Sequence, residues 1–176
     1  MSFTTDLEKH LFNVGDWVST KMKYHLYADK YKHKAMNIGE IWKCDLGHNV
    51  ADEKNKARPV VVVSNNKINQ SGKVIILSIT DAKGKINPKN KLPWKQSWFL
   101  MYANTTNPDN MFEPGRRIRN HRSVYNFLNK DSVLQCEEIR LVSKSRFDFS
   151  SGTPLGTIDP EDFKIIKNKM KKVFDI

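Results

Sequence analysis

The stretch KARPVVVVSNN, Lys56 to Asn66, places an arginine and a proline directly before four consecutive valines. A short β-branched run that ends in a polar Ser-Asn-Asn segment is typical of a buried strand. Arg58 stands at the mouth of this strand, and Pro59 restricts the backbone directly after it. Because an unpaired buried charge is costly, the guanidinium must meet an anion. That anion is either an internal carboxylate, for which Glu53 and Glu137 are the candidates, or the phosphate of a ligand.

Three further stretches have the same character as this strand. They read IGEIWKCDL, KVIILSIT and SVLQCEEIRLV, and occupy residues 38–46, 73–80 and 132–142. Each is short, rich in β-branched residues and bounded by Gly, Asn, Asp or Lys clusters. Their spacing, without intervening helices, favours an antiparallel sheet or a small barrel. We therefore predict an α+β fold that is mainly β.

A helix is predicted at the N-terminal end, over residues 4–35. Apolar residues recur there at intervals of three and four along one face: Leu7, Leu11, Val14, Val18 and Met22. The end of this helix, KMKYHLYADKYKHK, is basic and aromatic. Two interpretations follow, a packing arm whose charged side faces water or a dedicated binding element.

A second helix is predicted to begin at the sequence IDPEDF. Asp159 is a natural N-cap, and Pro160 suits the first helical position. The buried stripe of this helix is expected to consist of Phe163, Ile166, Met170 and Val173.

Composition limits the class of protein. A chain of 176 residues with 39% hydrophobic content can bury one core. Its formal charge of +11 indicates a polyanionic partner or serves solubility alone. Neither a signal-peptide core nor a run of eighteen apolar residues is present, so we expect a cytoplasmic protein without membrane contact. Cys44 and Cys136 lack CxxC spacing and are expected to be free buried thiols, with no metal site.

A long segment between the third and fourth predicted strands mixes aromatic residues with arginines. They are Trp94, Trp98, Tyr102 and Phe112, and Arg116, Arg117, Arg119 and Arg122. Bases of single-stranded nucleic acid stack on rings and guanidinium planes, and phosphates take the charge. Alternatively, the aromatic residues form a satellite core.

Familiar catalytic signatures are absent from the sequence, including GxSxG, GxxxxGK[ST] and HExxH. The five histidines do not pair at ligand spacing, and His48 is expected to be solvated in a polar loop. Any chemistry must therefore use charge, hydrogen bonds and ordinary carboxylates.

The order of the stretches closely resembles the MazF/PemK/Kid family of toxin–antitoxin toxins. GEIWKCDL, a loop with Glu53, ARPVVVVSN, VIILSIT and SVLQCEEIRLVSKSRF carry the resemblance from about Gly39 to Phe147. It implies an SH3-like antiparallel barrel that works as a homodimer. The domain would span residues 37–176 with an insert at about 94–127, and residues 1–36 would be a helical extension.

The resemblance also implies an activity and partners. Such toxins are metal-independent endoribonucleases that cut single-stranded RNA to a 2′,3′-cyclic phosphate and a 5′-OH, without a cofactor. A cognate antitoxin normally holds them inactive, and operator DNA is reached only through the antitoxin.

Carried over by position, the resemblance assigns a catalytic role to Arg58, Thr80 and Glu53. The RNA-binding residues would be Glu137, Ser64, Asn65, Lys54, Lys56, Arg140, Arg116, Arg117 and Arg119. Arg58 can place two parallel hydrogen bonds on the phosphorane, and Thr80 one more. Arg58 is a poor base, so Glu53 is the easier acceptor of the 2′-OH proton, although that role stays open.

Some features depart from the family pattern. Ala51 replaces the usual glycine, His48 stands where proline is common, and the third strand ends in LSIT. Two other functions therefore stay open: a toxin of the same fold that binds DNA gyrase, and an RNA-binding module without catalysis. A basic structural domain is a third possibility.

Overall fold

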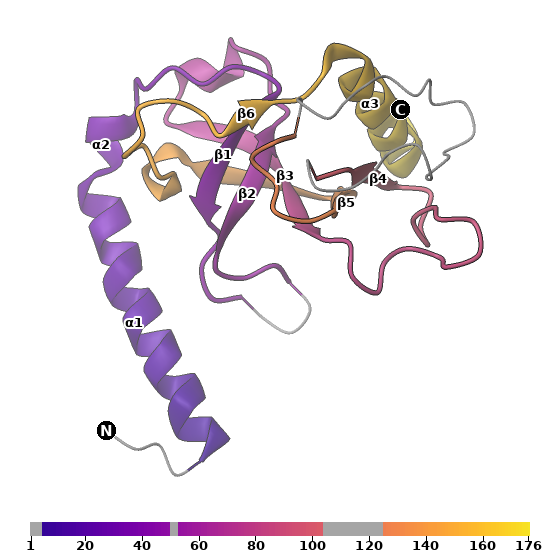
Figure 1. Ribbon diagram of the computed structural model, residues 1–176. Coiled ribbons are helices and arrows are strands. Elements are labelled where there is room, and N and C mark those ends of the chain that lie inside the picture. Colours follow the sequence, from indigo (N-terminus) through magenta and orange to yellow (C-terminus); the bar gives the residue numbers. More distant parts are fainter. Residues whose placement is uncertain (1–4, 50–52, 104–124) are drawn as a thin grey trace.

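The structure is a computed structural model that describes residues 5–49, 53–103 and 125–176. Six antiparallel strands form one curled sheet, a half-barrel, in the order β4-β5-β3-β2-β1-β6 (Figure 1). The strands are β1 (Glu40–Asp45), β2 (Ala57–Val62), β3 (Lys73–Asp81), β4 (Trp98–Met101), β5 (Ser132–Ser143) and β6 (Gly156–Thr157). The mainly β fold with a helix at each end is the predicted one.

All four predicted strands are present as β1, β2, β3 and β5. The sequence interpretation missed the two short strands, β4 and β6. β4 reads WFLM and lies inside the segment interpreted as an insert, where it pairs with β5 through Phe99 and Leu134. All four of its residues are buried, so no alternation of polar and apolar residues marks it as a strand.

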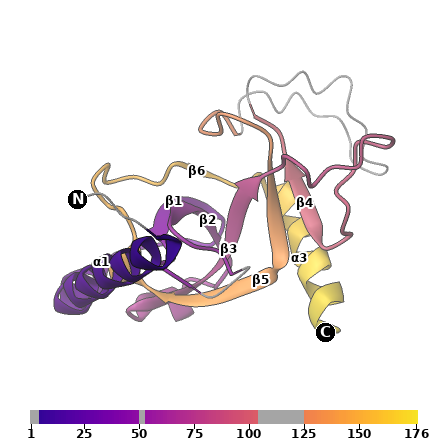
Figure 2. The same cartoon turned by 90° about the horizontal axis from the view of Figure 1, so that it is seen from below.

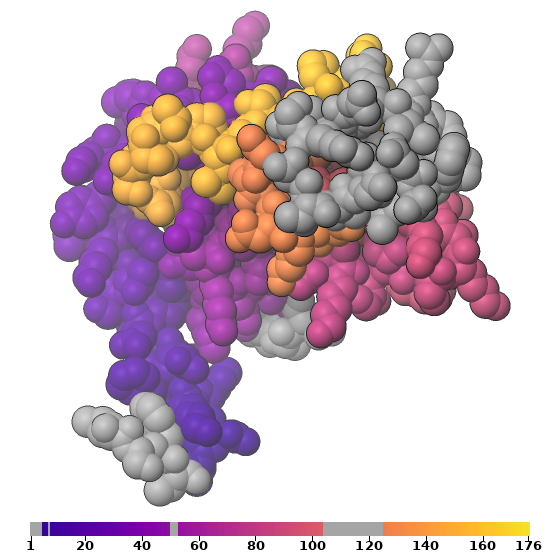
Figure 3. Space-filling model, in the orientation of Figure 1, coloured from indigo at the N-terminus to yellow at the C-terminus, as the bar shows by residue number. Residues whose placement is uncertain are grey.

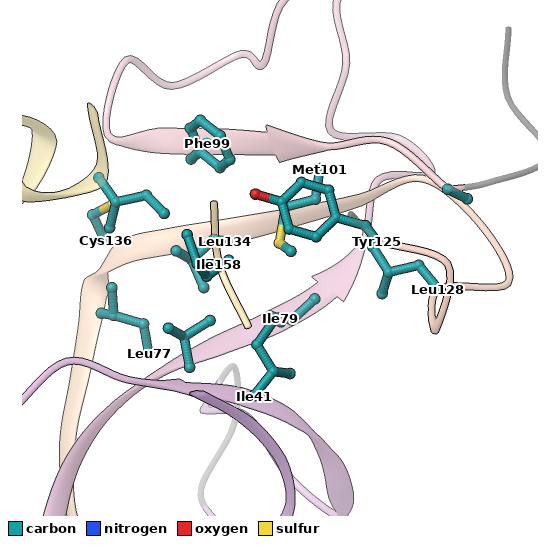
Figure 4. Packing of buried hydrophobic residues seen from close by; sticks show 13 residues of the cluster. Ile41, Leu77, Ile79, Phe99, Met101, Tyr125, Leu128, Leu134, Cys136 and Ile158 are labelled. Carbon is teal, nitrogen blue, oxygen red and sulfur yellow. The ribbon is translucent and has the colours of Figure 1, made fainter. Parts of the chain in front are cut away.

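The two faces of the sheet carry separate cores, because strand side chains alternate. One core contains Ile41, Val61, Leu77, Phe99 and Leu134 (Figure 4). The other core lies on the opposite face of the sheet. Its buried residues include Trp42, Cys44, Val60, Val62, Val74, Ile76 and Val142. Burying both faces of β2 explains its run of valines, since Val60, Val61 and Val62 are all fully buried although successive side chains point to opposite faces.

Helix α3 (Pro160–Phe174) covers the first core beside β4 and β5. Its start confirms the prediction, because Asp159 accepts hydrogen bonds from the amides of Glu161 and Asp162. Ile166 is fully buried, and the other residues of the predicted stripe are partly buried: Phe163, Met170 and Val173.

The N-terminal helix differs from its prediction in length and orientation. It divides at Tyr27 into α1 (Asp6–Leu26) and α2 (Ala28–Tyr31). Leu11, Val18 and Met22 of the predicted apolar face are 61%, 54% and 56% exposed. The opposite side of α1, with Trp17, contacts the rest of the protein. Helical periodicity finds a stripe, but it cannot show which side meets the body.

The N-terminal helix α1 lies far from the C-terminal helix. α1 and α3 are at opposite ends of the molecule (Figures 1 and 2). The N-terminal end of α1 extends beyond the rest of the molecule (Figure 3).

The aromatic segment supports the satellite-core alternative for two of its residues. Trp98 and Tyr102 are buried beside Ala82, Leu100 and Val133, whereas Trp94 is exposed. Phe112 lies outside the described residues.

Both cysteines are free buried thiols on strands, as expected. Burial raises the pKa of the Cys44 and Cys136 thiols to about 12. Within the described ranges, no helix is long and apolar enough to cross a membrane.

Candidate functional site

The guanidinium of Arg58 lies half-buried at the start of β2, on the face that also carries Val60 and Val62. Its Nε and Nη2 groups donate to the carbonyl oxygen of Asn55, at 3.0 and 2.6 Å. Among the described residues, Nη1 has no hydrogen-bond or ion-pair partner. As far as the described residues go, the Nη1 edge of the Arg58 guanidinium is therefore left for an external anion.

The loop before Arg58 is held together across its base. This β1–β2 loop comprises residues 46–56, of which 50–52 are outside the described ranges. The amide of Leu46 donates to Lys56, and that of Lys56 donates to Gly47, at 3.1 and 2.8 Å. The Asn49 side chain donates to the carbonyls of Leu46 and Lys54, at 3.0 and 2.6 Å. These bonds fix the loop backbone that includes Asn55, whose carbonyl accepts the hydrogen bonds of the Arg58 guanidinium.

Four charged side chains form a network around the end of this loop. Lys54 Nζ lies 3.4 Å from Glu138 Oε1, and Arg140 Nη2 lies 3.9 Å from Glu53 Oε2. Arg140 Nη1 also donates to the carbonyl of Lys54. Burial lowers the pKa of Arg58, an effect that Glu138 opposes and Arg140 strengthens. Glu138 is thus the carboxylate whose charge acts on Arg58, and the sequence interpretation did not select it.

An irregularity in β5 separates the two consecutive glutamates. Leu77 pairs with Ile139, but Ile79 pairs with Leu134, so residues 135–138 have no regular partners on β3. Bulges of this kind redirect side chains and often lie beside active sites. Glu138 pairs with Lys54 of the β1–β2 loop, and its Oε2 is buried without a hydrogen-bond partner among the described residues.

Glu137, the predicted RNA-binding glutamate, is placed on the β4 side. Its Oε1 accepts from Trp98 Nε1 at 2.6 Å and from Lys95 Nζ at 3.3 Å. Within the described ranges it forms no ion pair with Arg58, and neither does Glu53. Burial raises the pKa of Glu137, but hydrogen bonds led by that of Trp98 hold it below its ordinary 4.5.

This contact predicts a pH effect on stability. Because the pKa of Glu137 is lowered on folding, its stabilising contribution is present above pH 4.5 and is lost as pH falls through the folded-state pKa. We expect Glu137→Gln to be less sensitive to acid than wild type. Melting temperatures measured between about pH 3 and pH 6 check this, and parallel curves for the two proteins would contradict it.

Thr80 lies on β3, beyond the last residue that pairs with β2. Val60 of β2 and Ser78 of β3 form that last pair, so Arg58 and Thr80, two residues further along each strand, are not themselves paired. Directly opposed residues of an antiparallel pair share a face. Ser78 therefore shares the face of Val60, and its buried Oγ has no partner among the described residues.

Ser64 and Asn65 lie beyond the other end of β2, roughly 20 Å along the strand from Arg58. Ser64 Oγ is buried, contacts Asn69 Oδ1 and accepts from the amide of Ile75. Asn65 Oδ1 accepts from the amide of Ile68, at the start of the 3₁₀ helix η1 (Ile68–Gln70). Both side chains therefore stabilise a turn, and the structure does not bring them to Arg58.

The other predicted residues take different places. Lys56 is exposed, and its positive φ of 64° shapes the end of the loop. His48 contacts the ring of His10 with centroids 4.9 Å apart, so it is packed against α1 instead of being solvated. Arg116, Arg117, Arg119 and Arg122 lie outside the described residues.

A surface hollow of about 380 Å³ lies beside the loop and is lined in part by two arginines. Its lining includes Asn49, Arg140 and Arg146. Arg146, in the 3₁₀ helix η4 (Lys144–Arg146), donates to the carbonyl of Leu46 at 3.2 Å. The sequence interpretation missed Arg146, although the basic cluster SKSR next to a predicted strand marks it.

Together these groups can bind a phosphate-bearing chain. Arg58 at the start of β2 and Arg140 and Arg146 in the hollow supply cations, and the partly buried Thr80 on β3 carries a hydroxyl, whereas Ser78 is fully buried. Hydroxyl and guanidinium donors match phosphate oxygens. Among the residues that the structure describes, no three His, Cys, Asp or Glu side chains could hold a metal ion together.

Solved structures of toxins are similar to this chain. An endoribonuclease from a Mycobacterial species, in complex with its cognate antitoxin, is 17% identical with a TM-score of 0.50; the match covers 81% of this chain and 97% of that one. The Mycobacterium tuberculosis toxin MazF-mt6 is 15% identical with a TM-score of 0.49, over 78% and 97% of the two chains. MazF from Deinococcus radiodurans is 12% identical with a TM-score of 0.45, over 81% and 98%. At these identities, the likeness to the Mycobacterial endoribonuclease shows the fold alone.

No curated protein sequence matches the chain. The family model of the PemK-like, MazF-like toxin of type II toxin–antitoxin systems matches residues 37–174, most of the chain. The predicted resemblance is thereby confirmed, and the chain belongs to the family of PemK-like, MazF-like toxins of type II toxin–antitoxin systems.

Proposed function

We propose that this toxin is an endoribonuclease that cuts single-stranded RNA. The observation that supports this most is the half-buried Arg58 guanidinium, whose Nη1 has no partner among the described residues. A purely structural arginine at this depth would be expected to form an ion pair with a carboxylate.

The proposed reaction needs no group that the chain lacks. The 2′-OH of one nucleotide loses its proton to a carboxylate and attacks the adjacent phosphorus, and the bond from phosphorus to the 5′-oxygen of the next nucleotide breaks as that oxygen takes up a proton from water. The products are a 2′,3′-cyclic phosphate and a 5′-OH. Arg58 and Thr80 donate hydrogen bonds to the non-bridging oxygens, where negative charge develops. Holding the 2′-OH in line with the leaving oxygen supplies the remaining acceleration.

Two carboxylates are candidates for the acceptor of the 2′-OH proton. Glu53 lies next to Arg140, and Glu138 acts on Arg58 through its charge. A carboxylate accepts a proton more readily than an arginine, whose pKa stays high even when lowered. Of Glu53→Gln and Glu138→Gln, the variant with the larger loss of kcat identifies the acceptor.

RNA on either side of the cut would follow the basic hollow. Arg140 and Arg146 line it, and the formal charge of +11 favours a polyanion. We keep Lys54, Lys56, Arg116, Arg117 and Arg119 as proposed contacts to RNA phosphates, and we propose Glu137 only as support for Trp98.

We also propose the partners that the family suggests. A cognate antitoxin would cover the RNA-binding face, as a partner was captured with the Mycobacterial endoribonuclease. The chain would act as a homodimer in the cytoplasm and would reach operator DNA only through its antitoxin.

Purified protein incubated with a single-stranded RNA in excess EDTA tests the proposal. We expect cleavage, with new fragments that carry a 5′-OH and a 2′,3′-cyclic phosphate. Sequencing the 5′ ends of the fragments would give the preferred site. Intact RNA together with inhibited supercoiling by DNA gyrase would overturn the proposal in favour of a gyrase-binding toxin.

A further inference from the structure

The side of α1 that faces the body carries three aromatic rings at intervals of seven residues, or about two helical turns. Each ring meets the end of β1 or the β1–β2 loop. Tyr24 donates to Asp45 Oδ2 at 2.8 Å, Trp17 lies against Gly47, and His10 contacts His48. The N-terminal helix is therefore packed along the loop that precedes Arg58.

Asp45 joins the helix to the loop through its two carboxylate oxygens. Oδ2 accepts from the Tyr24 hydroxyl, and Oδ1 accepts from the backbone amide of Gly47 at 2.9 Å. Burial, and next the hydrogen bond to Asp45, raise the pKa of Tyr24, so its hydroxyl remains a donor. A shift of Tyr24 would displace the carboxylate that orients Gly47.

Gly47 and Trp17 approach so closely that only a glycine fits. A Cβ placed on Gly47 would lie 2.3 Å from the Trp17 ring, and the φ of Gly47 is +89°. The Arg146 guanidinium lies 5.1 Å from the centre of the Trp17 ring and donates to the neighbouring carbonyl of Leu46. Trp17 is thus held between the loop backbone and a cation of the basic hollow.

Hydrogen bonds connect this contact with Arg58. The carbonyl of Gly47 accepts from the amide of Lys56, and the amide of Asn49 donates to Asn55 Oδ1 at 2.7 Å. The carbonyl of the same Asn55 accepts both hydrogen bonds of Arg58. Displacement of Gly47 and Asn49 would therefore move the Asn55 carbonyl, which is the acceptor that orients the Arg58 guanidinium.

We propose that α1 is a brace for the β1–β2 loop, with Trp17 and Tyr24 as positioning residues that hold Arg58 in its working orientation. The effect on catalysis rests on the proposed endoribonuclease function, whereas the effect on the loop does not. The activity of this protein would therefore depend on α1, although the helix supplies no group to the reaction.

Hydrogen exchange of the full chain tests the brace without any substrate. In Trp17→Ala and in Tyr24→Phe, the amides of Gly47 and Lys56 should exchange about tenfold faster than in wild type. Met22→Ala, on the exposed side of the same helix, is the matched control and should leave both rates unchanged. Unchanged exchange of both amides in Trp17→Ala would overturn the proposal, whether or not the protein cuts RNA.

A pair of glycines separates the Trp17 contact from backbone strain. Gly39 and Gly47 have φ values of +86° and +89°, but a Cβ on Gly39 would meet only Thr157, at 3.8 Å. Gly47→Ala should lower the melting temperature by about 5 °C more than Gly39→Ala, and Trp17→Ala should remove the excess. An equal effect of the two glycine variants would contradict a brace at Gly47.

RNA cleavage gives the functional readout. Trp17→Ala should lower kcat by about 10²-fold, because a displacement near 1 Å in a catalytic group has that effect, and should change KM far less. Trp17→Phe, which keeps a ring on Gly47, should restore most of the activity. If the wild-type protein does not cut RNA, the proposed function is wrong. The hydrogen-exchange experiment then still tests whether α1 supports the loop, because it needs no substrate. Wild-type kcat in a Trp17→Ala variant with fast loop exchange would show that the loop does not position Arg58.

Discussion

Arg58→Ala is expected to lower the rate of RNA cleavage by about 10²- to 10³-fold, the effect of removing one preorganised donor from a developing oxyanion. The loss should fall mainly on kcat, because the phosphorane carries more charge on its non-bridging oxygens than the ground-state phosphate. Arg58→Lys should recover little, since an ammonium cannot donate two parallel hydrogen bonds in the plane of a guanidinium. Single-turnover cleavage of a short labelled RNA measures the effect.

Two controls keep this result specific. Lys73→Ala removes the same charge at the start of β3, from an exposed position, and should cut RNA at close to the wild-type rate. Circular dichroism and the melting temperature show whether each variant is folded. If a folded Arg58→Ala variant cleaves at the wild-type rate, Arg58 is not the catalytic arginine.

Lys144→Met is expected to have the largest effect on stability, a loss of about 3 kcal/mol in the free energy of unfolding. Lys144 is only 1% exposed, and its ammonium donates to the backbone carbonyls of Lys32, Lys34 and Asn69. Methionine retains much of the side-chain length but leaves these carbonyls without their donor. For a chain of this length, the melting temperature should fall by about 6–12 °C.

Lys130→Met is the matched control for this variant. Lys130 pairs with Asp81 at the surface with its side chain 68% exposed, and such pairs contribute about 0–1 kcal/mol. Urea unfolding of both variants measures the difference. Equal stabilities would mean that water replaces the Lys144 ammonium without loss, and that the segment after α2 is not held by it.

The four longer strands of the sheet could be predicted from the sequence, because short-range rules determine them, whereas the short strands β4 and β6 were missed. The valines of β2 identify a strand buried on both faces, and Asp159 and Pro160 mark the start of α3. Arg58 could also be singled out, since a cation beside an apolar run requires an anion wherever the strand lies.

The partners of these residues could not be predicted, because they depend on register and on packing between distant segments. The sequence of the doublet Glu137–Glu138 does not show which glutamate faces which side, and only the irregular pairing of β5 with β3 brings Glu137 to Trp98 and Glu138 to Lys54. Likewise, Ser64 is near Arg58 in the sequence but lies beyond the far end of an extended strand.

The sequence by itself determined the four longer strands, the start of α3 and which cation must find an anion, since propensity, capping and the cost of a bare charge act over a few residues. Only the tertiary structure decided which side of α1 meets the body and which of the two glutamates pairs with Lys54 in the loop before Arg58. Those choices follow from the contacts of Trp17 with Gly47 and of β5 with β3, which join residues far apart along the chain.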